Sequence, residues 1–107
     1  MLTVTQILID GGGTYSLDGT PVPSTGYFVS VPDRTLTVPA TVITQDILEA
    51  YAETVPAGLL LGGWVNKGLV YLDATEHFAD REEAIAEGIA RNQLAIWDIE
   101  NGEEIEL

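Results

Sequence analysis

The chain has 107 residues, of which 46% are apolar, and its 17 acidic side chains against four basic ones give a net charge of −13. A chain of this length fits a single domain and can bury a core without covalent staples. It contains no cysteine, so disulfides and thiolate metal sites are excluded. The negative charge repels nucleic-acid phosphates and anionic membranes, and direct binding to DNA or RNA is the least expected function.

The first half of the chain predicts strands before a helix. Residues 2–9 alternate apolar and polar side chains and then become apolar, which is typical of a strand. Residues 14–26 are rich in Gly, Pro, Ser and Thr and predict a loop or loose hairpin. Residues 26–31 predict a second strand, and residues 34–38 alternate cleanly and could pair with it. Residues 44–55 predict a helix with Thr44 as its N-cap.

The second half predicts a hairpin, a helix and a final hairpin. Residues 59–65 and 69–72 flank a tight turn, and Asp73 stands where a strand would end. Asp80 followed by Glu83 resembles a capping box for a helix through Arg91. We expect Ala84, Ile85, Gly88 and Ile89 to form the inward face of that helix.

The last hairpin is the clearest of these elements. Residues 94–99 predict a strand, Asn101-Gly102 favours a type I′ turn, and residues 104–107 predict an acidic edge strand. The sequence therefore predicts one α+β domain over residues 1–107, an antiparallel or mixed sheet of five to seven short strands with two helices packed on it.

One glycine-rich segment resembles a known sequence motif. Residues 7–14, Ile-Leu-Ile-Asp-Gly-Gly-Gly-Thr, resemble the first phosphate loop of the sugar kinase, heat-shock ATPase and actin superfamily, which implies backbone amides on phosphate and a metal near Asp10. The similarity covers only these residues, and neither a second nucleotide motif nor a second domain accompanies it. A glycine-rich turn after a strand is the favoured interpretation.

The residues give little support for metal binding or for nucleophilic catalysis. Asp73, Glu76, His77 and Asp80 could hold a divalent cation, but their spacing matches no known ligand pattern, and turn and cap roles explain two of them. With no cysteine, one histidine and no Gly-x-Ser-x-Gly segment, nucleophilic catalysis has no candidate site. We expect no catalytic residue, no metal site and no cofactor, and hence not an enzyme.

The acidic residues concentrate in the C-terminal third. Residues 73–107 hold eleven acids and two bases, whereas residues 1–72 hold six acids and two bases. Carboxylates on a helix or hairpin can stand in for phosphates on a basic partner, although an acidic face can equally serve only solubility. The candidate partner-binding residues are Glu82, Glu83, Glu87, Asp98, Glu100, Glu103 and Glu104.

Three aromatic residues lie on predicted strands. Trp64 and Tyr71 would be cross-strand neighbours, and Trp97 lies on the strand before the last turn. Core or half-buried packing is favoured over an exposed recognition patch.

Several segments resemble a known group of proteins. Residues 63–65, 70–73, 80–84 and 92–98 are similar to small uncharacterised acidic proteins of actinobacterial phages and prophages. The similarity covers about residues 26–107, and its most specific part is the helix followed by Asn-Gln-Leu-Ala-Ile-Trp-Asp at 92–98. The group has no known activity, so no functional residue is carried over; the resemblance implies a phage protein, a class that often inhibits host defence.

Charge and resemblance together predict a non-enzymatic accessory binding protein in the cytoplasm of a host cell. Its acidic surface would dock on a basic host protein, such as a nucleic-acid-binding defence enzyme, as an anti-restriction or anti-CRISPR type of inhibitor that could mimic DNA. The alternative is a phage structural or morphogenesis protein whose acidity serves only solubility. The N-terminus lacks the basic and long apolar segments of a secretion signal, and the absence of cysteine suits a reducing compartment.

Overall fold

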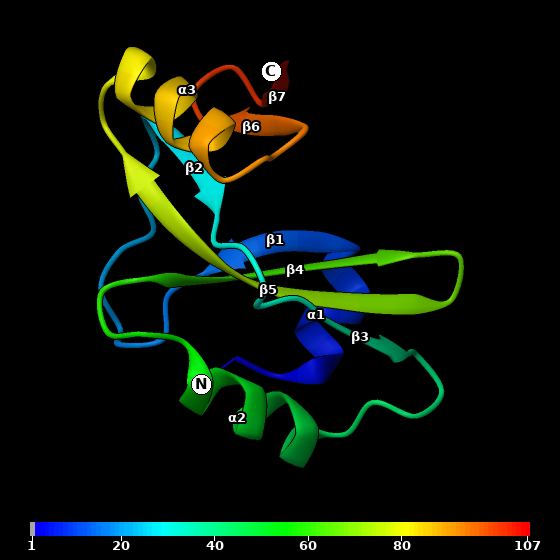
Figure 1. The fold of residues 1–107 in the computed structure, drawn as a ribbon. Helices are drawn as coiled ribbons and strands as arrows, with labels where there is room; N and C mark the ends of the chain where they lie inside the picture. Colours follow the sequence, from blue (N-terminus) through cyan, green and yellow to red (C-terminus); the bar gives the residue numbers. More distant parts are fainter. Residues whose placement is uncertain (1) are drawn as a thin grey trace.

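The structure, a computed structural model, describes residues 2–107. These residues form three helices and seven strands (Figure 1). In chain order the elements are α1 (Val4–Asp10), β1 (Gly12–Tyr15), β2 (Tyr27–Ser30), β3 (Leu36–Pro39), α2 (Gln45–Thr54), β4 (Leu60–Asn66), β5 (Leu69–Phe78), α3 (Arg81–Ala90), β6 (Ala95–Asp98) and β7 (Glu103–Glu106). The fold is a single compact α+β domain, as predicted, with one helix more than expected.

All seven strands belong to one antiparallel sheet that curls into a half-barrel (Figure 1). The strand order is β1-β4-β5-β2-β6-β7, and β3 pairs with β5 beside this path. The long strand β5 organises the sheet, because Leu69–Leu72 pair with β3 and Thr75–Phe78 pair with β2 along the same edge. The predicted pairing of residues 34–38 with residues 26–31 is therefore wrong: the edges of β2 are taken by β5 and β6.

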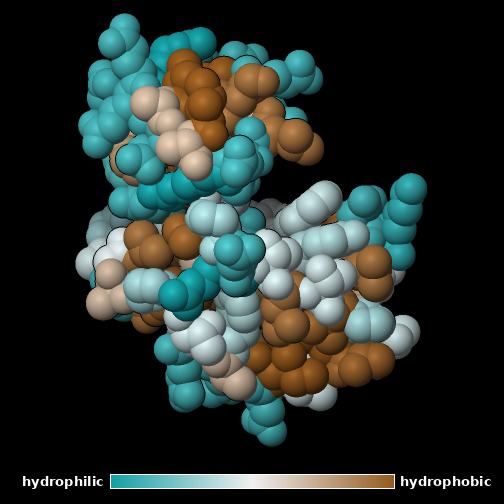
Figure 2. All heavy atoms as spheres, in the orientation of Figure 1, coloured by the Kyte–Doolittle hydropathy of each residue, from teal (hydrophilic) through white to brown (hydrophobic). Residues whose placement is uncertain are grey.

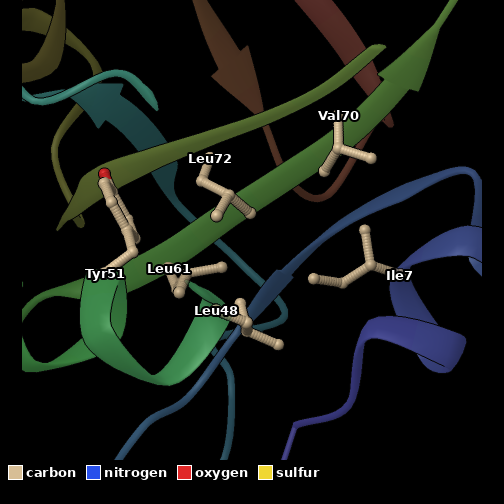
Figure 3. Close-up of a cluster of buried hydrophobic side chains, with 6 residues drawn as sticks. All are labelled: Ile7, Leu48, Tyr51, Leu61, Val70 and Leu72. Atoms are coloured by element: carbon tan, nitrogen blue, oxygen red, sulfur yellow. The ribbon is translucent and has the colours of Figure 1, made fainter. Parts of the chain in front are cut away.

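The helices cover one face of the sheet. Beneath α1 and α2 lies a buried cluster of aliphatic side chains and one tyrosine (Figure 3): Ile7, Leu48, Tyr51, Leu61, Val70 and Leu72. Beneath α3 lies a smaller cluster of Val29, Ala84 and Ile96, against which Phe78 packs. Val70, Leu72 and Phe78 are separated by even numbers of residues on β5, so both clusters lie on the same side of the sheet. We call this side the covered face and the opposite side the open face.

Residues 2–9 are largely helical, which contradicts the predicted strand. The Thr3 hydroxyl caps α1 by accepting a hydrogen bond of 3.1 Å from the Gln6 N–H. Gly11 ends the helix in the left-handed conformation, with φ 74°, which suits glycine because it lacks a Cβ. Ile7 points into the core with no exposed surface. Burial of the face of α1 that carries Ile7 outweighs the weak preference of the β-branched residues for strands.

The other two helices begin where the sequence places them. The Thr44 hydroxyl accepts from the Ile47 N–H at 3.2 Å, and the Asp80 carboxylate accepts from the Glu83 N–H at 2.9 Å. In α3, Ala84 and Gly88 face the sheet as predicted, but Ile89 is 59% exposed and does not belong to the inward face. Gly88 fits closely, since a Cβ there would lie 2.6 Å from the Leu107 Cδ1 atom.

The two hairpins, β4–β5 and β6–β7, are closed by turns of different kinds. Between β4 and β5, Lys67 and Gly68 both have positive φ angles, as a two-residue type I′ turn requires. Between β6 and β7 the expected Asn101-Gly102 hairpin is present, but only Gly102 has a positive φ. The Asp98 carboxylate accepts from the Asn101 backbone N–H and side-chain amide, which holds a longer loop in place of the predicted type I′ turn.

Among residues 2–107, no helix has the length and apolar character needed to cross a bilayer.

Candidate functional site

A cleft of about 600 Å³ occupies the open face of the sheet. One wall comes from β1 and β4, the other from β6 and β7, and β2 and β5 form the floor. In Figure 2 a notch separates the part of the molecule above it, which carries α3, from the part that carries α1 and α2. Curling of the sheet away from its helices thus leaves a concave surface of the size that ligand sites commonly have.

Asp73 lies on the floor of this cleft. Its carboxylate accepts hydrogen bonds from the Ser30 hydroxyl at 3.2 Å and the Thr75 hydroxyl at 3.1 Å. Burial raises the pKa of Asp73 above its usual value even though these two bonds favour the charged form. The expectation that Asp73 ends a strand is wrong: β5 continues to Phe78, and Asp73 lies where its neighbour along one edge changes from β3 to β2.

Gly62 makes room for the Asp73 carboxylate. The two residues are paired across β4 and β5, and a Cβ on Gly62 would lie only 2.1 Å from the Asp73 Oδ1 atom. The neighbouring Gly63 faces the covered side, where a Cβ would meet only ordinary contacts of 3.6 Å or more. A glycine inside a strand often marks such a close approach, so Gly62 was the one signal in the sequence that could have located this site.

Aromatic side chains surround the acidic floor. Trp64 stacks on Tyr71 with ring centroids 4.5 Å apart, which confirms that the two are cross-strand neighbours. Trp64 and Trp97 are 49% and 41% exposed, so neither tryptophan lies in the core, and both are half-buried, the second of the two packing states that the sequence favoured. Phe28, by contrast, is buried beside Trp97 on the same face.

The cleft carries only negative charge. Among the side chains that line it, Asp73 and Glu104 are charged and none is basic. Glu104 is exposed and lies opposite Trp97 in the β6–β7 pairing, so it points to the open face at the rim. The aromatic wall and the acidic rim therefore lie side by side on one concave surface.

The structure divides the predicted partner-binding acids into three groups. Glu82, Glu83, Glu100, Glu103 and Glu104 are exposed. Glu87 lies 3.3 Å from the Arg91 Nε atom and is partly neutralised by this ion pair. Asp98 is only 3% exposed and faces the α3 side, where bonds from the Asn101 side chain hold its pKa below the usual range, with a smaller contribution from Arg81. Asp98 therefore has a structural role in the loop and offers no surface to a partner.

Four of the exposed acids lie at one end of the molecule. Arg81 at the start of α3 lies near Asp98, and Gly88 near its end lies against Ile96 and Leu107, so α3 runs antiparallel to β6. The first turn of α3 and the β6–β7 loop consequently share one end, visible beside the label α3 in Figure 1. We call this surface the acidic end; it consists of Glu82, Glu83, Glu100 and Glu103.

The other motifs of the sequence separate in the structure. Glu76 pairs with Arg91 at 2.5 Å, His77 Nε2 lies 2.8 Å from the Thr25 carbonyl, and Asp80 caps α3. Within residues 2–107 no group of three or more acidic or histidine side chains is arranged to hold a metal ion. The segment that resembles a phosphate loop follows a helix instead of a strand, and Asp10 accepts a hydrogen bond of 2.9 Å from the Tyr15 hydroxyl.

A second hollow of about 510 Å³ lies on the covered side, between α1, α2 and the loop after β1. Its lining is mostly aliphatic, with Glu49 as its charged residue, whereas the cleft on the open face has on its floor a carboxylate that two hydroxyl groups hold in place. The cleft on the open face is therefore the better candidate for a binding site. Comparison of the chain with protein families, curated proteins and solved structures gave no match.

Proposed function

We propose that this chain is a non-enzymatic binding protein that docks on a basic protein through its C-terminal part. The observation that carries the proposal is the open face itself, where exposed tryptophans and unopposed carboxylates lie together. Exposed aromatic side chains are typical anchors of protein interfaces. The acidic end next to this face would attract a basic partner from a distance and orient it.

The partner class follows from the charge. A basic surface that normally holds nucleic acid is complementary to carboxylates on a helix and a loop, so the protein would act as a DNA mimic on a nucleic-acid-binding enzyme. If the chain is a phage product, as its resemblance implies, that enzyme would belong to host defence and the protein would be an anti-restriction or anti-CRISPR type of inhibitor in the host cytoplasm.

The test is a comparison of two charge-reversed triple variants. Glu82, Glu83 and Glu103 of the acidic end are changed to Lys in one variant, and Asp46, Glu49 and Glu53 around α2 are changed to Lys in the control. Each immobilised protein is exposed to host lysate at about 50 mM and about 500 mM salt, because high salt screens exposed charges. We expect the unmodified protein and the control to retain basic proteins at low salt and the first variant to lose them. Equal capture by both variants would contradict the proposal.

The second candidate function is a phage structural or morphogenesis component. Its support is the exposure of Trp64 and Trp97, which could make apolar contacts without any electrostatic attraction. The same experiment separates the two functions, since an apolar complex keeps its affinity as salt rises and is indifferent to reversal of Glu82, Glu83 and Glu103.

A further inference from the structure

Among residues 2–107, the carboxylate of Asp73 has no cationic partner. Within residues 2–107 the ion pairs join Arg91 to Glu76 and to Glu87, and no basic side chain lines the cleft. A carboxylate that is half-buried without a cation is costly, and proteins usually avoid it unless function requires it.

The geometry of Asp73 suits a planar cation. Each carboxylate oxygen accepts one hydrogen bond from the floor, Oδ2 from Ser30 and Oδ1 from Thr75. A carboxylate oxygen can accept about two such bonds, so each keeps one free position. A guanidinium binds carboxylates through two paired N–H groups, one to each oxygen, and so would use both free positions.

The walls of the cleft suit the same group. Trp64 and Trp97 border the cleft on opposite walls, and each exposes close to half of its surface. A guanidinium stacks on aromatic faces, and its aliphatic stem packs on apolar side chains. Lysine would lack both the planar fork and the stacking.

We propose that the cleft receives one arginine side chain of the partner protein, with its guanidinium on the Asp73 carboxylate and its stem against the tryptophans of the walls. Glu104 at the rim adds negative charge at the entrance. This inference rests on the proposed function, because it names the group through which a basic partner is held. Burial raises the pKa of Asp73, because it makes the charged form unfavourable. In the complex, the positive charge of the arginine offsets this free-energy cost.

The experiment uses two capped pentapeptides, Gly-Gly-Arg-Gly-Gly and the same peptide with citrulline, which has the shape of arginine without its charge. Binding is followed by NMR through the indole N–H signals of Trp64 and Trp97 and the amide of Gly62. We expect the arginine peptide to shift these signals and the citrulline peptide to leave them unchanged. Asp73→Asn should weaken arginine binding at least tenfold, or about 1.4 kcal/mol, while its spectrum shows that the fold is intact.

Equal shifts with both peptides, or equal affinity of Asp73→Asn, would overturn the inference. The variant with Glu82, Glu83 and Glu103 changed to Lys separates it from the proposed function, because those residues do not line the cleft. The affinity of that variant for the arginine peptide should lie within about twofold of the affinity of the unmodified protein, because distant exposed charges add only a screened long-range attraction. Arginine binding without capture of any basic protein would refute the proposed function and leave the arginine site standing.

Discussion

Asp73 is the residue at which stability and the proposed binding of arginine oppose each other. It lies in the middle of a strand, on the floor of a cleft, where burial disfavours its charge. Ser30 and Thr75 compensate in part by donating hydrogen bonds to it. A charge kept in such a place without a cation is typical of a functional residue that costs the fold some stability.

Asp73→Asn should therefore stabilise the protein at pH 7, by about 1 kcal/mol, the usual scale of a single substitution. The sign follows from linkage: the pKa of Asp73 is raised in the folded state, so the protonated form favours folding and that contribution is lost as pH rises through the folded-state pKa. Thermal unfolding of both proteins between pH 7 and pH 3.8, the ordinary pKa of the group, measures the difference. We expect the advantage of the variant to shrink as pH falls; an advantage that grows would show that Asp73 is stabilised as a carboxylate.

At the scale of elements, the pairing of β4 with β5 depends on which face each glycine occupies. Gly62 faces Asp73 on the open side, and Gly63 faces Ile7 and Leu72 on the covered side. The two residues are adjacent and identical, yet only the first lies against the Asp73 carboxylate. They form a matched pair for testing the floor of the cleft.

Gly62→Ala should destabilise the protein by about 1–2 kcal/mol, because its Cβ displaces the Asp73 carboxylate from the hydroxyl donors. Gly63→Ala should change the free energy of unfolding by less than about 0.5 kcal/mol or stabilise it, since its Cβ meets ordinary contacts and glycine is costly in a strand. Denaturant unfolding measures both. In an Asp73→Ala background the cost of Gly62→Ala should disappear, and its persistence would place the clash elsewhere.

Elements with strong local signals were predictable from the sequence, and those decided by long-range contacts were not. Thr44 and Asp80 mark their helices because a cap needs only its own first turn. Residues 2–9 fit strand and helix patterns alike, and only packing of Ile7 on the sheet decides between them. The continuation of β5 past Asp73 was missed because an aspartate is usual in turns, whereas here it faces a glycine across the sheet.

The candidate site was predicted only in its chemistry. The acids of the C-terminal third were identified as partner candidates, whereas the three aromatic residues were expected to pack in or near the core, and the arrangement of both sets depends on the curl of the sheet. That curl brings Trp64 of β4 and Trp97 of β6 to opposite walls of one cleft. Asp98 was predicted to face a partner but is buried; nothing in its local sequence separates a loop-closing carboxylate from an exposed one.

At the scale of the whole molecule, β5 joins two buried clusters into one cooperative unit. Val70 and Leu72 belong to the cluster beneath α1 and α2, and Phe78 packs on the cluster beneath α3. Neither cluster can lose its part of β5 without disturbing the other. We therefore expect a single unfolding transition, as is usual for a domain of this size.

The two tryptophans allow a direct test of this unity, because Trp64 lies in β4 and Trp97 in β6. In Trp64→Phe the fluorescence reports on the part near α3, and in Trp97→Phe it reports on the part near α1. For each variant, the denaturant midpoint by fluorescence should coincide with its own midpoint by circular dichroism. Separate midpoints in either variant would show that the two clusters unfold independently.

The pairing pattern of the sheet also implies an order of assembly. The pairs β4–β5 and β6–β7 are hairpins closed by short loops, whereas Tyr27 pairs with Phe78 and Gly12 pairs with Trp64 across about half of the chain. Closing long loops is slow, because their entropy must be lost before the contacts form. The hairpins should thus appear early and the walls of the cleft should meet last, so the binding surface would exist only in molecules that have finished folding.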